Sequence, residues 1–443
     1  MAYIKGEARA QQTMFPLTLD ELISVDHVCR VIEAFVNKLD VAGLGFLRAE
    51  PADTGRPGYD PRDLLKLYLY GYLQQVRSSR RLEAECRRNV EVMWLMGRLI
   101  PDYKSIAEFR RVHREAVTAA GAELVRLARQ VGLVKGEWVA IDGSKFRAVS
   151  SADRVGEREA VKRYLEQLES ADQQDEVSID DTAVAAAMEK LKNDPEPEAR
   201  FMRMAQNAHA PAYNVQTAVD ATHGIIVAQQ VTTEANDNRS LLPMARAAKE
   251  ALGAPESLNV IADAGYSNGE QAAQCETHGI VPHVPANRTA NNKGDGTLFD
   301  RTLFVYDEKT DTFRCPANQT LHRKQMLSRK KSVIYAAEEK TCSQCPLKSQ
   351  CTSTTRRFVQ RHIHDAALQR MDARATAQAM RLRQCTVERP FALLKWVIFG
   401  HPRFLLRGVS GAQVEISLAT MAYNLKTMMH VVGGSKLNNI LTA

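Results

Sequence analysis

The sequence predicts a mixed α/β fold preceded by an all-helical region, and three observations support this prediction. Apolar residues recur at helical spacing up to about residue 130, and from residue 137 the pattern changes to the short apolar runs typical of strands. The later segments follow one another as strand, strand, strand, helix, strand, helix, strand and long helix. A doubly wound parallel sheet is excluded, because it needs a crossover helix after every strand.

Residues 1–130 are expected to form a helical domain. Asp60–Pro61 supplies an N-cap and a first-turn proline, and Ser105 with Glu108 forms a capping-box pattern at the start of a later helix. Short arginine-rich helices joined by tight turns are typical of helix-turn-helix DNA-binding domains, although a helical bundle with solvated arginines fits the pattern equally well. The arginines that would contact DNA are Arg80, Arg81, Arg87, Arg88, Arg110 and Arg111.

Residues 137–430 are expected to form the mixed sheet, its flanking helices and two insertions. An acidic insertion at 151–200 is predicted to be helical or disordered, and a basic, cysteine-rich insertion is predicted at 287–360. The first predicted strand lies in the segment 137–146 and ends at Asp142-Gly143. The other predicted strands cover 212–220, 224–233, 257–266 and 280–287. The predicted helices start near Asn236 or Asp237 and close at Gly253, then cover 269–278 and 365–395.

Composition narrows the class of protein. The 443 residues are 44% hydrophobic and 25% charged, which excludes a low-complexity or collagen-like chain. No apolar run approaches the roughly 20 residues that cross a bilayer, and the N-terminus lacks the apolar segment of a secretory signal. We therefore expect a cytoplasmic protein with no membrane partner, whose eight cysteines are mostly reduced. A net charge of +7 alone says little about partners, but a basic body with a local acidic insertion is compatible with binding a polyanion.

Three acidic residues form the candidate catalytic group. Asp142 and Asp263 each end an apolar strand, and if the two strands are neighbours both carboxylates emerge at one edge of the sheet. Converging carboxylates repel each other unless a cation such as Mg²⁺ binds them, and two-metal phosphoryl chemistry needs such ligands. Glu388, on the helix after the last strand, is the candidate third ligand. Taken singly, each acid is better explained as a turn, cap or surface residue; taken together and in this order, a catalytic role explains them better.

Other polar residues of this region are expected to be structural. Asp220 lies in a predicted hairpin turn and Asp237 near a predicted helix start, so neither is expected to be catalytic. His209 and Asn214 are likewise expected to have structural roles.

The acidic motifs resemble those of a known family. Asp142 in AIDGSKF, Asp263 in VIADAGYSN and Glu388 in TVERPFALLK are similar to the three acidic motifs of the DDE transposases of bacterial insertion sequences. These proteins share the ribonuclease H-like fold, whose mixed sheet is flanked by helices. Lys395 follows the glutamate by seven residues, as in the Y-R-E-K signature of one large transposase group. The resemblance covers residues 137–430, and the basic helical N-terminus also resembles the DNA-binding part of such proteins.

The sequence departs from that signature at two positions. Arg381 stands where the signature has tyrosine, and Gln384, with Arg383 adjacent, stands where it has arginine. DNA contacts of the missing tyrosine and arginine are therefore not carried over. Lys395 does match, and the resemblance implies that it contacts element-end DNA near the cut, with Arg383 as a neighbouring candidate.

The resemblance implies a DNA transposase that cleaves the ends of its own insertion sequence and joins them to target DNA. Asp142, Asp263 and Glu388 would hold two Mg²⁺ or Mn²⁺ ions for phosphodiester hydrolysis and strand transfer. Double-stranded DNA would be bound by a homodimer or higher oligomer, near the nucleoid of a bacterial cell. Two alternatives remain open: a catalytically silent DNA-binding regulator derived from a transposase, and a stand-alone ribonuclease H-like nuclease.

The cysteine-rich insertion carries a candidate zinc site. Cys342-x2-Cys345 and Cys351 have a compact chelating spacing, and Cys315 is the candidate fourth ligand of a structural Zn²⁺. A cluster of buried thiols without metal is the alternative. The zinc ion would hold together an insertion that is expected to be too polar to build its own core.

Two basic runs, at 322–331 and 356–362, lie in the same insertion. Charge runs of this kind are usually solvated faces of a protein. Because these two flank the candidate zinc site and belong to a chain that is expected to bind DNA, we predict that they position phosphates without sequence specificity.

Overall fold

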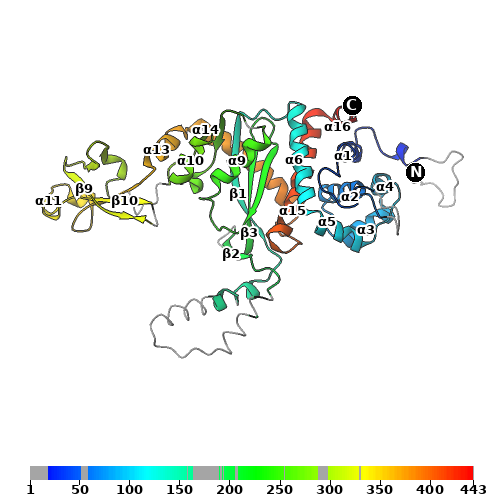
Figure 1. Ribbon diagram of the computed structural model, residues 1–443, viewed down its shortest axis with the longest axis horizontal. Coiled ribbons are helices and arrows are strands. Elements are labelled where there is room, and N and C mark those ends of the chain that lie inside the picture. Colours follow the sequence, from blue (N-terminus) through cyan, green and yellow to red (C-terminus); the bar gives the residue numbers. More distant parts are fainter. Residues whose placement is uncertain are drawn as a thin grey trace, which may run out of the picture. The chain divides into compact units, whose positions relative to one another are not determined.

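The computed structural model of the protein describes residues 18–442 apart from 51–57, 157, 163–188, 190–191, 193, 205–207, 254, 288–297 and 329–330. The chain forms two compact units, and each is described by itself (Figure 1). The first comprises Met1–Leu133, Lys145–Tyr213 and Pro390–Ala443, and the second comprises Val134–Ser144 and Asn214–Arg389. Most of the acidic insertion predicted at 151–200 lies outside the described residues.

A mixed sheet forms the base of the second unit. Its strands are β1 (Trp138–Arg147), β3 (His209–Asp220), β4 (Ile226–Thr232), β5 (Leu258–Ile261) and β6 (Ile280–His283). They are ordered β4-β3-β1-β5-β6, with β3 and β4 antiparallel and with β1, β5 and β6 parallel. A hairpin on one side of the first strand and parallel strands on the other is the strand order of the ribonuclease H-like fold, so the predicted fold class is confirmed. The short strand β2 (Arg200–Arg203) pairs with the start of β3 in the first unit.

Helices cover this sheet (Figure 1). They are α9 (Leu241–Ala251), α10 (Gly269–Thr277), α13 (Asp365–Arg374) and α14 (Ala377–Ala392). Ala379 and Val387 of α14 form a buried cluster with Ala140 of β1 and Ile261 of β5. This helix therefore lies against the two central parallel strands, whose apolar residues are buried as parallel strands require.

Two helix boundaries differ from those predicted. The helix expected at 365–395 is two helices, because the backbone of Ala375 leaves the helical region (φ −76°, ψ 60°). Helix α9 begins at Leu241 rather than near Asn236 or Asp237. Asp237 consequently lies in the loop after β4 instead of at a helix start, and this position determines its role below.

The cysteine-rich insertion folds as a second, antiparallel sheet. Its strands are β7 (Val305–Asp307), β8 (Thr312–Arg314), β9 (Thr320–Leu327), β10 (Ser332–Ala336) and β11 (Phe358–His362), and its short helices are η5 (Arg301–Leu303), α11 (Glu339–Ser343) and α12 (Lys348–Cys351). The order is β11-β10-β9-β8-β7. The expectation that this insertion has no core is wrong, since a small cluster is buried here: Phe304, Phe313, Leu321, Val333, Tyr335, Ala337 and Val359.

The entry side of this insertion is attached to helix α13. The amide of Ala286 donates a hydrogen bond of 2.7 Å to the carboxylate of Asp372. Further along, Arg301 forms an ion pair of 2.7 Å with Asp365, which is almost fully buried. Since α13 itself begins at Asp365, shortly after β11, the insertion starts and ends beside the same helix.

The first unit consists mainly of helices. They are η1 (Asp20–Leu22), α1 (Val28–Asn37), α2 (Pro61–Leu73), α3 (Ser79–Arg88), α4 (Val90–Leu95), α5 (Tyr103–Val112), α6 (Arg114–Gln130), η7 (Leu393–Ile398), α15 (Gly408–Val432) and α16 (Gly434–Thr442). The long helix α15 packs against α2 and α6: Tyr72 donates to the fully buried Glu415 at 3.3 Å, and the hydroxyls of Thr118 and Ser417 lie 3.2 Å apart. The C-terminal helices thus complete the core of the N-terminal helices.

The local signals at two helix starts had different outcomes. Asp60 caps α2 by accepting a hydrogen bond from the Arg62 amide, and Pro61 occupies the first turn, as predicted. The capping box predicted at Ser105 is wrong, because Asp102 is the N-cap of α5 and accepts hydrogen bonds from the Ser105 amide and hydroxyl. In the part of the chain that is described, no helix combines the length and apolar character needed to cross a bilayer.

Candidate active site

Asp142 and Asp263 come together at one edge of the sheet in the second unit. Strands β1 and β5 are parallel neighbours, and Ala140 pairs with Ile261, so each aspartate stands two residues beyond the same paired position. The Nη2 atom of Arg383 on α14 lies 2.9 Å from Asp142 Oδ1 and 3.4 Å from Asp263 Oδ2. A single guanidinium nitrogen therefore contacts both carboxylates.

The two aspartates occupy different backbone structures. Strand β1 does not end at Asp142, as was predicted, but continues to Arg147. Asp263 follows β5 and is the N-cap of the 3-10 helix η3 (Ala264–Tyr266), where its Oδ1 accepts a hydrogen bond of 2.8 Å from the Gly265 amide. Its other oxygen, Oδ2, faces the arginine. Asp263 is therefore both a capping residue and a member of the acidic pair.

Asp142 lies in a strongly electronegative environment. Its side chain is 21% exposed, compared with 47% for Asp263. Burial raises the pKa of the Asp142 carboxyl, and the charges of Asp263 and Asp237 raise it further, whereas Arg383 and the Gly143 amide lower it. Arg383 contacts Asp142 and Asp263, Asp237 lies close enough to act on the Asp142 carboxyl, and carboxylate oxygens of this kind suit a divalent cation.

Asp237 belongs to this group, although its place near a predicted helix start indicated only a structural role. The side-chain amides of Asn214 and Gln216 each donate a hydrogen bond of 2.6 Å to Asp237 Oδ1. The Tyr266 hydroxyl donates to Gln216, and burial together with the three carboxylates raises the pKa of this tyrosine well above its ordinary value. Tyr266 therefore stays protonated and completes a chain of hydrogen bonds that fixes Asp237.

A polar pattern in β3 is the signal that could have revealed this network. Asn214 and Gln216 are fully buried, and residues two apart in a strand point to the same face of the sheet. Because buried amides need hydrogen-bond partners, this pair predicts a polar group opposite them. Gly143 leaves room for that group: a Cβ atom there would lie 2.6 Å from Asp237 Oδ1. Asn214, like Asp237, is thus part of the site.

Asp220 has the structural role that its place in the hairpin suggested. It is fully buried, and its carboxylate accepts hydrogen bonds of 2.9 Å from the amides of Gly136 and Thr222. These bonds fix the hairpin and leave the carboxylate no role in the acidic group. His209, the first residue of β3, is exposed and belongs to the first unit.

Glu388 is not joined to the two aspartates. It follows Val387, whose side chain is buried against β1 and β5. A helix turns about 100° per residue, so the side chain of Glu388 is directed away from this buried face, and it is exposed. Within the described ranges, ligand oxygens of Glu388, Asp142 and Asp263 do not all lie within 4.8 Å of one another. Its assignment as the third ligand stays a prediction.

Two models of transposase families match this sequence. A transposase domain (DUF772) matches residues 17–112, and a transposase DDE domain matches residues 171–425, which is more than half of the chain. The chain belongs to the DDE transposase family. The predicted family is thereby confirmed. Asp237, Asp263 and Glu388 of this DDE transposase lie within the second match, and Asp142 lies before it.

This DDE transposase is also similar to one solved structure, the cryo-EM structure of a piggyBac transposase synaptic complex with hairpin DNA. The two chains are 9% identical with a TM-score of 0.33, and the match covers 94% of this chain and 78% of that chain. No curated protein matches the sequence of this DDE transposase. The fold assignment rests on the strand order described above.

The N-terminal arginines of this DDE transposase have contrasting environments. Arg110 is 5% exposed and its guanidinium lies 5.2 Å from the centroid of the Tyr68 ring, so its predicted contact with DNA is corrected to a core position. Arg80 and Arg81 are exposed. The remaining three, Arg87, Arg88 and Arg111, are exposed and form ion pairs within their own helices with Glu83, Glu85 and Glu108.

Lys395 of this DDE transposase lies on the π-helix η7, in the first unit. Its Nζ atom is 5.7 Å from the centroid of the Phe146 ring, and the neighbouring Trp396 is 59% exposed. π-helices are rare in proteins, and those that occur are often found at functional sites. The contact of Lys395 with element-end DNA stays a prediction, and a partly buried lysine beside an exposed aromatic ring is compatible with it.

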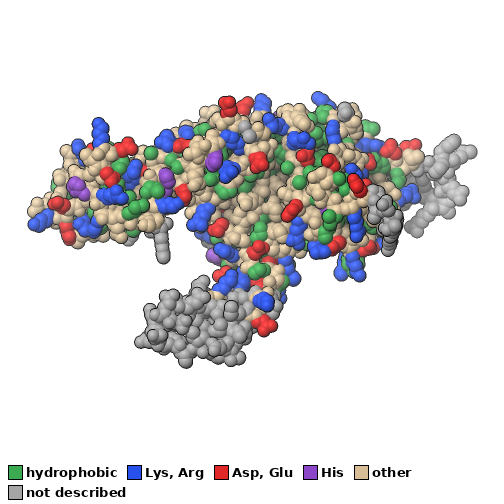
Figure 2. Space-filling view, viewed as in Figure 1, with side chains coloured by type: hydrophobic (Ala, Val, Ile, Leu, Met, Phe, Trp, Pro, Cys, Tyr) green, Lys and Arg blue, Asp and Glu red, His purple; other side chains and the backbone are tan. Residues whose placement is uncertain are grey.

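The basic runs of the insertion form part of an exposed sheet face. Phe358 of β11 is 44% exposed, and the charged groups of Lys324 and Arg356 lie 5.2 Å and 5.4 Å from the centroid of its ring. Figure 2 shows lysine, arginine and histidine side chains on the part of the surface that β9 and β10 occupy in Figure 1. Phosphate positioning by this face remains a prediction.

One trio of potential metal donors lies within 4.8 Å among the described residues: His27, Cys29 and Glu91. These groups already serve the helix bundle. His27 Nδ1 accepts from the Cys29 amide at 3.3 Å and caps α1, and Glu91 accepts from the Tyr70 hydroxyl at 2.7 Å. Burial raises the pKa of Cys29 to about 12, so its thiol stays protonated and is a poor metal ligand.

Proposed function

We propose that this DDE transposase cleaves the ends of its own mobile element and joins them to target DNA with the help of divalent metal ions. The observation that supports this proposal is the contact of one Arg383 nitrogen with both Asp142 and Asp263. Two carboxylates on neighbouring parallel strands form an edge that can receive a phosphodiester once their charge is offset.

The residues at this edge fit a hard cation. Asp142 and Asp263 offer carboxylate oxygens, which Mg²⁺ and Mn²⁺ prefer, and Asp237 adds a nearby negative charge. We assign the third ligand to Glu388 on α14. When bound, the ions would activate a water molecule for attack on the phosphodiester and stabilise the leaving oxygen.

The protein's own residues prepare this edge. Asn214 and Gln216 hold Asp237 in place, so the negative charge beside Asp142 is fixed before any ligand arrives. Arg383 offsets the repulsion between the two aspartates, and a guanidinium can also bind phosphate oxygens in a bidentate manner. We therefore assign Arg383 a second role as a contact to the DNA backbone. The partner is double-stranded DNA, and because two element ends act together we infer a homodimer or larger assembly.

The test is metal-dependent cleavage of DNA that carries the inverted repeats flanking the gene. We expect the full-length protein to nick these ends only with Mg²⁺ or Mn²⁺ and to form joined products when target DNA is added. Asp142→Asn should bind the same DNA and cleave it at least about 100-fold more slowly, because a metal ligand is lost. Glu256→Gln is a matched control, since Glu256 is exposed in the loop before β5.

Three outcomes contradict parts of the proposal. Full cleavage by Asp142→Asn would remove that residue from the active site. Binding without cleavage by the wild-type protein, in the presence of either metal, would favour a DNA-binding regulator. Cleavage that never yields joined products would favour a stand-alone nuclease.

A further inference from the structure

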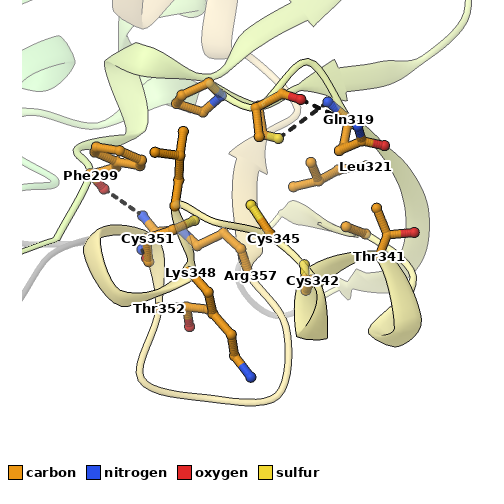
Figure 3. A pocket seen from close by; sticks show the side chains of 15 residues that line it. Phe299, Gln319, Leu321, Thr341, Cys342, Cys345, Lys348, Cys351, Thr352 and Arg357 are labelled. Atoms are coloured by element: carbon orange, nitrogen blue, oxygen red, sulfur yellow. Dashed lines mark hydrogen bonds between the residues drawn. The ribbon is translucent and has the colours of Figure 1, made fainter.

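Four cysteines of the insertion surround one small cavity. Cys315 follows β8, Cys342 lies on α11, Cys345 lies in the turn after it, and Cys351 ends α12. The cavity has a volume of about 30 Å³, and the four side chains line it together with apolar residues of the sheet. Figure 3 shows the labelled Cys342, Cys345 and Cys351 around this hollow. All eight cysteines of the chain are free thiols.

The turn that carries Cys315 is shaped to support a thiolate. The Cys315 amide donates to the Gln319 carbonyl at 2.9 Å, and the Gln319 amide donates to Cys315 Sγ at 3.3 Å. Asn318, between them, adopts a left-handed conformation with φ of 58°. The turn therefore holds the Cys315 sulfur at the lining of the cavity.

Arg357 is a buried cation beside these sulfur atoms. It is 9% exposed, and it donates hydrogen bonds of 2.9 Å and 3.0 Å to the carbonyls of Cys351 and Phe299. Its Nε has no hydrogen-bond partner, and among the described residues no carboxylate forms an ion pair with it. A buried guanidinium without a counter-charge is costly, so the structure requires negative charge nearby.

The sulfur atoms are the groups that can supply this charge. All four cysteines line the same cavity as Arg357. Four thiolates in one cavity would oppose one another's charge. A divalent soft metal removes that opposition, and four thiolates around one Zn²⁺ leave a net negative charge beside the arginine.

We propose that Cys315, Cys342, Cys345 and Cys351 bind one structural Zn²⁺ ion, with Arg357 as the buried counter-charge of the thiolate cage. The ion fixes helices α11 and α12 to the sheet β7–β11, whose core is a small cluster. Across the described residues no three of these sulfur atoms lie within 4.8 Å of one another, whereas zinc ligands lie about 3.8 Å apart. Binding therefore includes rotation of the cysteine side chains into the cavity. This proposal does not depend on the function proposed above.

The test is the zinc content of the full-length protein, purified under reducing conditions and dialysed after exposure to Zn²⁺. We expect about one zinc ion per chain, and about one Co²⁺ ion per chain with the visible absorption of a tetrahedral four-sulfur complex when cobalt replaces zinc. Cys345→Ser should bind less than about a tenth as much zinc under the same conditions. Cys385→Ser is the matched control, because Cys385 is exposed on α14 and should leave the zinc content unchanged.

Arg357 gives a second, independent measurement. Arg357→Met should weaken zinc binding by about 10–100-fold in a competition with a chelator, whereas Arg357→Lys should retain most of the affinity. A wild-type protein that binds neither zinc nor cobalt when fully reduced would overturn the proposal. So would unchanged zinc content in Cys345→Ser, or a disulfide between two of the four cysteines in protein isolated without oxidant.

Discussion

The second unit contains two groups of candidate metal ligands, and one arginine lies beside each group. At the sheet edge, Arg383 contacts Asp142 and Asp263, and the Asp263 side chain is 47% exposed. In the insertion, Arg357 is buried beside the four cysteines, which enclose a cavity of about 30 Å³. The first group is open to solvent at Asp263, whereas the cysteines of the second group are partly buried around a small cavity.

This difference separates two uses of a metal ion. Oxygen ligands at an open edge suit a hard cation that must also contact a substrate, so some coordination positions have to stay accessible. Four sulfur ligands fill the tetrahedral coordination of a zinc ion. They leave no position for a substrate and therefore suit a structural zinc ion. The arginines differ accordingly: Arg383 can exchange its carboxylate partners for phosphate, whereas Arg357 is held by backbone carbonyls.

The largest expected effects come from removing one ligand in each group. Asp263→Asn should reduce metal-dependent DNA cleavage at least about 100-fold while leaving the zinc content unchanged, because only the open edge loses a ligand. Cys345→Ser, by contrast, should first of all lose zinc. Its unfolding temperature should also fall, since metal binding is coupled to folding. Nicking assays, metal analysis and thermal unfolding on both variants make the comparison. Loss of zinc in Asp263→Asn would show that the two groups are not independent.

A large effect on stability is expected from Gly143→Ala. The added Cβ would lie 2.6 Å from Asp237 Oδ1 and still closer to the Gln216 amide, so the hydrogen-bond network must move. We expect unfolding in urea to require about 1–3 kcal/mol less free energy, together with a loss of cleavage. Gly156→Ala is the matched control, because no atom lies within 4 Å of a Cβ there. Equal stability of the two variants would show that the network can relax around the methyl group.

A smaller effect is expected from Arg383→Gln. Removing the guanidinium deletes a positive charge that opposes cation binding at the edge, so Mg²⁺ should bind about fivefold more tightly in the absence of DNA. Cleavage should nevertheless fall, because a phosphate contact is lost. Isothermal titration calorimetry measures the first effect, with Arg383→Lys as the control that keeps the charge. Weaker Mg²⁺ binding would show instead that the arginine holds the aspartates in position for the metal.

The smallest effect is a pH dependence of stability in metal-free protein. The pKa of Asp142 in the folded state is raised by burial and by neighbouring carboxylates, so its ionisation opposes folding. The penalty is absent at pH values below its ordinary pKa of 3.8, grows as pH rises through that value and is complete above the raised pKa. Asp142→Asn should therefore gain stability relative to wild type as pH rises, in thermal unfolding measured with a chelator. If the unfolding temperatures of the two proteins changed equally with pH, Asp142 would carry no such penalty.

Local structure and the pairing of the two aspartates were predictable from the sequence. The N-cap and proline at Asp60–Pro61 act within a few residues, and the helix begins where they predict. Asp142 and Asp263 were predictable because each comes directly after an apolar run, 139–141 and 260–262, and parallel neighbours bring such residues close together. The strand order required only the sequence of apolar runs and the hairpin.

The remaining features depend on contacts that the sequence does not display. Asp237 was missed because its partners come from β3, far away in the chain, and because α9 begins later than its composition suggests. Arg110 looks like any arginine of a basic helix, yet Tyr68 covers it in the core. Ser105 was a plausible cap, but Asp102 stands three residues earlier and starts the helix there by accepting from the Lys104 and Ser105 amides. In each case tertiary packing or a stronger local competitor decides the outcome.

The attachment of the cysteine-rich sheet to α13 has a consequence for how this protein can diverge. Ala286, before the sheet, is bonded to Asp372 of that helix, and the chain enters the same helix at Asp365 after the sheet. A replacement segment would need to span only the short distance between Ala286 and the start of α13. The free energy of closing such a gap changes slowly with the length of the inserted chain. The sheet can therefore be replaced by another segment, in evolution or by engineering. Such a replacement would change the binding surface of the protein and leave the acidic edge intact.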